Sequence, residues 1–299
     1  MARSVLNGAG NGPAGGKPAR GVGVSPPPLS VPADLERQAF FHVRQFGGAE
    51  LILGDHVVAS GRPALHEDVE IRLVTAGEVR VRIDGESRLL PAGTLLRIPP
   101  AQLHSFADGS TYSFLALHVA PSLLQRRGHP AWHPQGLETH ATEAARAEVI
   151  AAACAALQAL SEGAPAPESA DRVITALVDW AATVESRVRS RPASRVPAID
   201  RALAYLREHY ARELAIDDVA AAAGLSKFYF VRLFASTLGV TPHRYQMLLR
   251  VACSRRLLRA GTDIAEVATH TGFFDQSHFT RCFREIVGVT PGRYQLEVS

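Results

Sequence analysis

Alternation between apolar and polar residues dominates the chain from about residue 40 to residue 119. In VRVRIDGESRLL, residues 79–90, apolar and charged side chains alternate, which is typical of strands with one buried face. The Asp84-Gly85 pair inside this segment is a hairpin signal. LLRIPP and SFLALHVAP have the composition of further short strands, and turn signals recur between them. Many short strands with frequent turns predict a β-sandwich or a β-barrel for this region.

The apolar spacing lengthens to a helical period after Pro121. The segment TEAARAEVIAAACAALQAL begins at Thr142, a favourable N-cap residue, and SADRVITALVDWAATVESRVR carries one apolar stripe at helical spacing. Prolines and small residues mark residues 190–197 (SRPASRVP) as a linker, and the remainder of the chain has a helical pattern. Residues 1–32 are mainly Gly, Pro, Ala and Ser, and we expect them to be disordered.

The last hundred residues contain an internal repeat. Residues 216–246 and 264–295 align with an offset of 48 positions, which becomes 49 after one inserted residue. Fourteen identities over about thirty aligned positions make the second segment a duplicate of the first. Each copy has the pattern of a short helix, a tight turn and a second helix, which is a helix-turn-helix. We expect the two units at about residues 216–238 and 264–287.

Glycines and polar capping residues predict the boundaries of these helices. Gly224 and Gly272 stand where the first helix of each unit must end in a left-handed residue. Ser226 and Asp275 stand at the N-cap of each second helix, and Asp263 caps the first helix of the second unit. The segment PHRYQMLLRVACSRRLLRA between the units predicts a helix of some eighteen residues, roughly 27 Å long.

Helical spacing divides the second helix of each unit into a packed face and an opposite face. Phe230 and Phe234, like Phe279 and Phe283 in the other copy, fall on one side and are assigned to the core. Because Arg can pair with guanine and Gln with adenine in the major groove, the opposite face is typical of a DNA-reading helix. The candidate DNA-binding residues are Lys227, Phe228, Val231 and Arg232 in the first unit and Gln276, Ser277, Thr280 and Arg281 in the second.

Charge and composition restrict the partners. Residues 196–299 hold 13 Lys+Arg against 10 Asp+Glu and so carry the whole net charge of +3, which points to an anionic partner there. No stretch approaches the roughly 18 apolar residues of a membrane span, and the N-terminus lacks the apolar core of a signal peptide. The three cysteines show no paired spacing. We therefore expect a cytoplasmic protein without a membrane partner.

Residues 196–299 resemble the DNA-binding domain of the AraC/XylS family of bacterial transcription regulators. The resemblance rests on GLSKFYFVRLFASTLGVTPHRYQ in the first unit and DIAEVATHTGFFDQSHFTRCFREIVGVTPGRYQ in the second. It implies base and phosphate contacts from the exposed residues of both second helices. Phe228 and Val231 depart from the family pattern toward apolar residues, which favours contact with a thymine methyl over hydrogen-bond readout by the first helix.

The strand region resembles the cupin-type sensor domain that many members of this family carry. HEDVEIRLVTAG (66–77) looks like the first cupin motif, and GTLLRIPPAQLH (93–104) looks like the second. Carried over, His66, Glu70 and His104 take ligand-like positions, either in a metal site or in a pocket for an organic effector. Asp68 stands where a second histidine is expected, and Ala101 replaces a glycine. We therefore expect an effector pocket, with no metal and no cofactor.

These patterns together predict an α+β protein. Its expected parts are a disordered tail (1–32), a cupin-like effector-binding β-barrel (33–125), a helical dimerisation or coupling region (126–189), a linker (190–197) and an all-α DNA-binding domain (198–299).

We expect a sequence-specific transcription regulator without catalytic residues. Its expected partners are double-stranded DNA, a small-molecule effector and a second copy of the chain, with RNA polymerase as a further candidate. Activation and repression both stay open. Two alternatives also stay open: a cupin-type metalloenzyme with an attached DNA-binding domain, and a non-specific architectural DNA binder.

Overall fold

The structure is a computed structural model, and the residues that it describes are 43–46, 49–83, 86–107, 109–126, 175 and 196–298. Several expectations lie outside these residues. They are the disordered tail over 1–32, nearly all of the helical region over 126–189, and the first part of the linker over 190–197.

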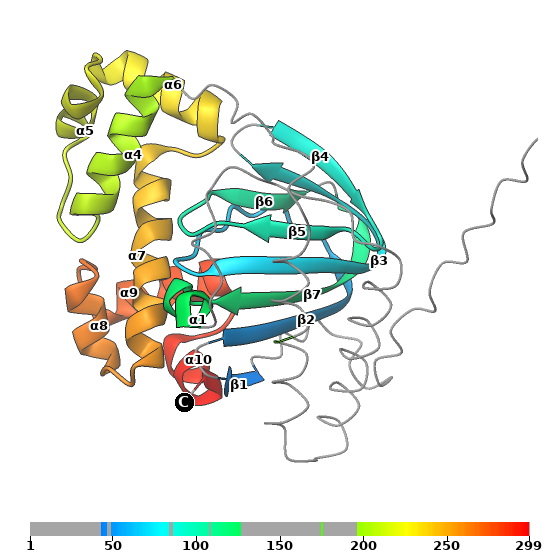
Figure 1. The fold of residues 1–299 in the computed structure, drawn as a ribbon. Helices are drawn as coiled ribbons and strands as arrows, with labels where there is room; N and C mark the ends of the chain where they lie inside the picture. Colours follow the sequence, from blue (N-terminus) through cyan, green and yellow to red (C-terminus); the bar gives the residue numbers. More distant parts are fainter. Residues whose placement is uncertain are drawn as a thin grey trace, which may run out of the picture.

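The N-terminal part of the described chain folds into an antiparallel sheet, which we call the sheet domain (Figure 1). Its strands are β1 (Val43–Phe46), β2 (Ala49–Val58), β3 (Val69–Ile83), β4 (Glu86–Pro91), β5 (Leu95–Ile98), β6 (His104–Ala107) and β7 (Thr111–Val119). The strand order is β1-β2-β7-β3-β4, and β5 and β6 also pair with β3. The predicted α+β class with an N-terminal β domain is confirmed.

Strand β3 is the centre of the sheet domain, since its two halves pair with different neighbours. The first half lies between β5 and β7, and the second half pairs with β4 and β6. The second half forms the predicted hairpin with β4, in which Ile83 lies opposite Glu86, and its burial alternates as expected. The first half, residues 69–75, is buried throughout, as a strand covered on both faces is. This burial takes Glu70 and Arg72 into the interior.

The C-terminal part is helical throughout and begins one residue before the predicted domain start. A short helix, α1 (Pro121–Arg126), follows the sheet. The remaining helices are α4 (Pro197–His209), α5 (Ile216–Ala223), α6 (Lys227–Leu238), α7 (Pro242–Arg259), α8 (Ile264–His270), α9 (Gln276–Val287) and α10 (Pro291–Val298). Among these described helices none is by itself long and apolar enough to cross a membrane. Helices α5 and α6 meet that test only jointly, across a bend of 80°.

The helices of both units begin and end close to the residues that the capping pattern indicates. Gly224 closes α5 with φ 72°, and Gly272, with φ 79°, follows the last residues of α8. Asp263 and Asp275 accept backbone N–H bonds at the starts of α8 and α9. Ser226 stands at the N-cap of α6, but its side chain makes no capping hydrogen bond.

Helix α7 connects two hydrophobic cores (Figure 1). One core packs α4, α5 and α6 against the first half of α7 around Phe230 and Phe234, and the other packs α8, α9 and α10 against α7 around Phe279 and Phe283. The four phenylalanines are fully buried, as the helical spacing predicts. The single helix therefore fixes the two helix-turn-helix units relative to each other, and its other side faces the sheet domain.

Candidate functional site

The polar face of α9 lies opposite its packed phenylalanines, as the sequence predicts. Gln276, Ser277 and Arg281 are exposed and Thr280 is half-buried. Asp275 fixes the first turn of the helix because its carboxylate accepts the N–H of the third helical residue at 2.6 Å. The helix therefore presents a row of hydrogen-bond donors and acceptors on a rigid, well-packed support, which is what readout of base edges requires.

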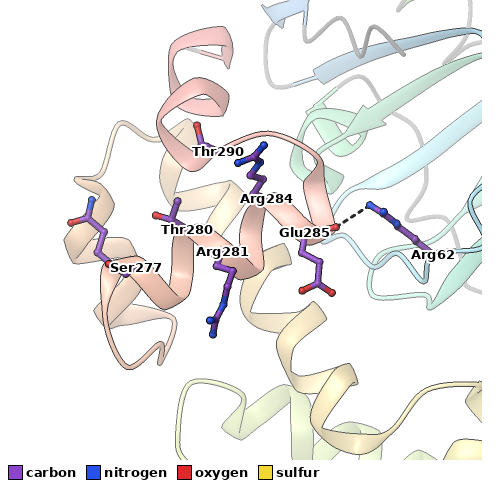
Figure 2. A pocket seen from close by; sticks show the side chains of 8 residues that line it. Arg62, Ser277, Thr280, Arg281, Arg284, Glu285 and Thr290 are labelled. Carbon is purple, nitrogen blue, oxygen red and sulfur yellow. Dashed lines mark hydrogen bonds between the residues drawn. The ribbon is translucent and has the colours of Figure 1, made fainter. Parts of the chain in front are cut away.

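A pocket lies between this face of α9 and a loop of the sheet domain (Figure 2). Arg62 enters it from the sheet domain, and a nitrogen of its guanidinium donates to the backbone carbonyl of Glu285 at 3.4 Å. The other lining residues are Gln276, Ser277, Thr280, Arg281, Arg284, Glu285 and Thr290. The sheet domain therefore reaches one end of the surface that the sequence assigns to DNA.

The corresponding face of α6 is more apolar. Lys227 and Arg232 are exposed, and the ammonium of Lys227 pairs with the carboxylate of Asp217 at 2.8 Å. Phe228 is 84% exposed, whereas Val231 is half-buried and packs against the core around α4 to α7. Of the two apolar candidates in this unit, Phe228 is therefore the one available to a partner.

Phe274 is a candidate contact residue that the sequence prediction did not include. It lies in the turn before α9 and is 93% exposed. Phe228 stands at the start of α6, so both units expose an aromatic ring near the N-terminus of the second helix. An exposed large apolar residue is informative when it sits inside a candidate interface. The signal in the sequence was that Phe274 is the inserted residue between the two copies.

A second group of polar residues lies inside the sheet domain, and we call it the histidine–glutamate cluster. The Nε2 atoms of His66, His104 and His118 lie 3.0, 3.4 and 3.6 Å from one oxygen of Glu70, Oε2. All four residues are buried. The structure thus brings together the three residues that the sequence proposed for an effector pocket.

His118 is the member of this cluster that the sequence prediction missed. It lies on β7, directly opposite Glu70 of β3 in the antiparallel register. Its signal was weak, because it is one polar residue in the otherwise apolar strand segment FLALHV. Only the pairing of β3 with β7 makes it a neighbour of Glu70.

Arg72 fixes the orientation of the Glu70 carboxylate. Its Nε donates to the other oxygen, Oε1, at 2.5 Å, and its Nη1 donates to the hydroxyl of Tyr112 at 3.1 Å. The guanidinium also lies over the rings of Phe106 and Phe114, at 3.9 and 4.0 Å from their centres, as in cation–π contacts. The Oε2 atom is therefore left to face the three histidines.

The protonation preferences of the cluster follow from burial and charge. Burial alone would raise the pKa of Glu70, but Arg72 and the hydrogen bonds from the histidines outweigh it and hold that pKa well below its usual range. Burial lowers the pKa of His104, and burial together with the neighbouring His66 lowers the pKa of His118 well below its usual value. Burial thus favours the neutral forms of His104 and His118, while Arg72 favours the ionised form of Glu70.

A third group joins the sheet domain to α7 and α10, and we call it the interdomain ion cluster. Glu50 of β2 is fully buried and pairs with Arg255 at 2.5 Å and Arg259 at 3.2 Å. Asp68, just before β3, pairs with Arg259 at 2.7 Å, and the hydroxyl of Tyr294 on α10 donates to Glu50. Burial alone would raise the pKa of Glu50, but the two guanidiniums hold it well below its usual range.

A second set of contacts extends this interface along α7. The thiol of Cys253 donates to a carboxylate oxygen of Glu67 at 3.2 Å, and Arg256 pairs with the other oxygen at 3.1 Å. Burial raises the pKa of Cys253 to about 12. Leu65 and Leu103 of the sheet domain belong to the same hydrophobic core as α4 to α7. The two domains therefore share apolar as well as ionic contacts.

Residues 66–70 belong to both polar clusters. His66 and Glu70 face each other in the histidine–glutamate cluster, while Glu67 and Asp68 pair with arginines of α7. The ring of His66 also donates its Nδ1–H to the backbone carbonyl of Asp68 at 2.7 Å. A displacement of this segment by a bound molecule would therefore alter the contacts with α7.

Two family models match the chain, in separate regions. The model described as AraC-like ligand binding domain matches residues 48–178, which include the sheet domain from β2 onward. The model described as helix-turn-helix domain matches residues 219–297, which include α6 to α9. The two matches thus separate the histidine–glutamate cluster from the candidate DNA-reading faces.

Individual proteins are similar to the chain over different lengths. The uncharacterized HTH-type transcriptional regulator YbfI of Bacillus subtilis (strain 168) is 27% identical over 223 residues, which are 71% of this chain and 79% of YbfI. The HTH-type transcriptional activator RhaS of Escherichia coli O157:H7 is 38% identical over 77 residues, 25% of this chain and 28% of RhaS. Among solved structures, ToxT from Vibrio cholerae O395 is 12% identical with a TM-score of 0.48, covering 84% of this chain and 97% of ToxT.

Proposed function

Because the chain belongs to the AraC family of transcriptional regulators, we propose that it reads a specific DNA sequence and that its sheet domain senses a small molecule. The family is non-enzymatic, so the metalloenzyme alternative is set aside. The observation that carries the proposal is the exposed polar face of α9 on a fully buried phenylalanine core, repeated in part by α6. Helices α6 and α9 both belong to units that pack against α7, and two such helices could enter two adjacent segments of the major groove.

The test of sequence specificity is a competition experiment. The full chain would first be used to isolate and sequence the DNA that it binds in cells. Its affinity for the recovered site would then be measured by fluorescence anisotropy against bulk DNA. A specific regulator should prefer its site by at least about 10³-fold. A ratio near one would instead identify an architectural binder and overturn the proposal.

The sensor function is proposed for the histidine–glutamate cluster. His66, Glu70 and His104 would contact the effector, and His118, which lies beside Glu70, would join them. An effector changes DNA binding only if it has different affinities for two arrangements of the domains. Residues 66–70 would supply a physical connection, because His66 and Glu70 belong to this cluster while Glu67 and Asp68 pair with α7.

Activation and dimerisation are finer parts of the same proposal. RhaS is described as an activator, and we extend that role to this chain on the similarity of their helical domains. Dimerisation is assigned to the region over 126–189, most of which lies outside the described residues. Promoter fusions in cells, with and without the gene, would distinguish activation from repression. Sedimentation of the purified chain should show a dimer, and a monomer would contradict the dimerisation proposal. Pull-down of RNA polymerase would test whether the polymerase binds this chain.

A further inference from the structure

Three arginines from two domains line the pocket beside α9. Arg281 and Arg284 belong to α9, and Arg62 belongs to the sheet domain (Figure 2). All three are exposed, and within the part of the chain that the structure describes none of them forms an ion pair with a carboxylate. The carboxylate of Glu285 also lines the pocket, but it pairs with Arg244 of α7 at 2.9 Å. The pocket therefore carries positive charge that no described residue neutralises.

The remaining lining residues provide hydroxyl and amide groups. They are Gln276, Ser277, Thr280 and Thr290. Guanidinium groups and side-chain hydroxyls are the donors that proteins direct at the phosphates of DNA. Gln276, Ser277, Thr280 and Arg281 are also the candidate DNA-reading residues of α9. Because the pocket is continuous with that face, the anion that it suits is the DNA held by the same helix.

The loop that carries Arg62 is tied to β6 on both sides of this residue. The backbone N–H of Gly61 donates to the carbonyl of Phe106 at 2.7 Å, and Ala64 and His104 exchange two backbone hydrogen bonds, of 2.8 and 3.1 Å. Gly61 has φ 67°, a left-handed conformation that favours glycine. The turn therefore holds Arg62 in a defined place at the edge of the sheet domain.

The guanidinium of Arg62 keeps donors for a further acceptor. Its Nη1 donates to the backbone carbonyl of Glu285 at 3.4 Å (Figure 2). This carbonyl is among the last four of α9, which have no partner within the helix. A guanidinium has five N–H donors in a planar fork, so one long contact holds the group beside α9 and leaves others to bind an anion.

The position of Arg62 along α9 matches the edge of a major groove. A recognition helix contacts base edges with its N-terminal residues. Gln276 and Glu285 are nine residues apart, roughly 14 Å at 1.5 Å per residue, and the major groove is about 12 Å wide. When the first turns of α9 lie on the bases, the end near Glu285 therefore reaches the sugar–phosphate backbone. Arg62 contacts α9 at that end.

From these observations we propose that Arg62 of the sheet domain binds a phosphate of the DNA backbone, together with Arg284, which lines the same pocket. The sheet domain then takes a direct part in DNA binding, and the contact fixes its position on the DNA without reading bases. The inference rests on the proposed function, in which α9 enters the major groove, and assigns a second domain to that interface.

The test is the salt dependence of DNA binding by the full chain. Fluorescence anisotropy would measure the affinity of the unmodified chain and of Arg62→Ala for the recovered site and for an unrelated duplex between 50 and 200 mM salt. Loss of one phosphate contact should make the slope of log affinity against log salt concentration less steep by about 0.9. The affinity lost in Arg62→Ala should therefore be about 3.5-fold greater at 50 mM than at 200 mM. The preference for the recovered site over the unrelated duplex should not change, because a phosphate contact is uniform across sequences.

Two further variants separate the phosphate contact from other effects of the substitution. Arg88→Ala removes the same charge from β4 of the same domain and should keep the slope of the unmodified chain. Arg62→Lys retains a cation and should restore most of the slope that Arg62→Ala loses. Equal slopes for Arg62→Ala and Arg88→Ala on both duplexes would overturn the inference, and so would tighter binding by Arg62→Ala, which would show that the sheet domain masks α9. If the chain preferred no sequence, the proposed function would fail, while the slope on the unrelated duplex would still test Arg62.

Discussion

Arg281 and Phe274 are two exposed side chains near the proposed DNA-reading face of α9. Arg281 is exposed on the polar face of α9 and lines the same pocket as Arg62. Phe274 lies in the preceding turn and is 93% exposed. The guanidinium can pair with guanine or phosphate, and the ring can contact a thymine methyl or a sugar. Neither side chain is needed for the core, so each can be removed without unfolding the domain.

We expect Arg281→Ala to lose about 1–3 kcal/mol of specific DNA binding, since a charged donor to a base or phosphate is removed. Gel-shift titration on the recovered site measures the loss. Arg88→Ala is the matched control, because Arg88 lies on β4, away from α9, and pairs with nearby Glu86 at 3.3 Å. Equal affinity of the two variants would contradict the assignment of Arg281 to the DNA interface.

Phe274→Ala should weaken DNA binding about tenfold, or ~1.4 kcal/mol, without lowering thermal stability. The ring is exposed, so its removal leaves no cavity in the core. Anisotropy titration and a melting curve together measure both effects. Leu296→Ala is the control, because Leu296 is also a highly exposed apolar residue but lies on α10. If Phe274→Ala lowers the melting temperature instead, the ring has a structural role.

At the scale of elements, α7 packs against both helix-turn-helix units and also contacts the sheet domain. Arg255 and Arg259 lie on it and pair with Glu50, and Cys253, two residues before Arg255, contacts Glu67. A buried ion pair is a weak source of net stability, but removal of one partner leaves uncompensated charge. The interface is therefore sensitive to single substitutions.

Glu50→Gln should destabilise the protein by about 3–5 kcal/mol, because it leaves two buried guanidiniums with less compensation. Urea unfolding measures the change, and Glu86→Gln in the half-buried surface pair with Arg88 should stay within about 1 kcal/mol. The pKa of Glu50 is lowered, so its contribution is complete above its unfolded value and is lost as pH falls through the lowered pKa. We therefore expect the difference between Glu50→Gln and the unmodified chain to be the same at pH 6 and pH 8.

Cys253 offers a direct measure of how closely the two domains contact each other. Its raised pKa of about 12 leaves little thiolate near pH 8, so iodoacetamide should modify it slowly. The rate should rise about tenfold per pH unit from pH 8 to pH 10, without the plateau of a thiol with a pKa near 8.5. Peptide mapping measures the rate at which iodoacetamide modifies Cys253. Glu50→Gln should increase that rate if the substitution opens the interface between the domains. Rapid modification of the unmodified chain would show that the interface is open in solution.

At the scale of the whole molecule, the sheet domain lies against the same helix that holds both DNA-reading units (Figure 1). Residues 66–70 contribute to the histidine–glutamate cluster and contact α7, while Arg62 contacts the end of α9. An effector bound at that cluster, as proposed, and DNA bound at α9 would therefore act on one connected set of residues. Such a connection gives coupling only if the ligand distinguishes two arrangements of the domains.

The sequence by itself determined the parts that depend on local pattern. Helical spacing, glycine positions and caps fixed the two helix-turn-helix units and the buried sides of α6 and α9, because these signals lie within a few residues of one another. The alternation of apolar and charged residues over 79–90 likewise predicted the hairpin of β3 and β4. The resemblance to a cupin motif predicted ligand-like positions for His66, Glu70 and His104, and the three residues do lie together.

Only the tertiary structure decided which distant residues meet. His118 joins Glu70 through the register of β7 on β3, and Glu50 meets Arg255 across 205 positions of sequence. Arg62 reaches α9 in the same way. A local pattern records whether a residue is buried, but not which residue lies opposite it, because that depends on strand pairing and on how the domains pack. The proposed coupling between the two domains rests on those long-range pairings.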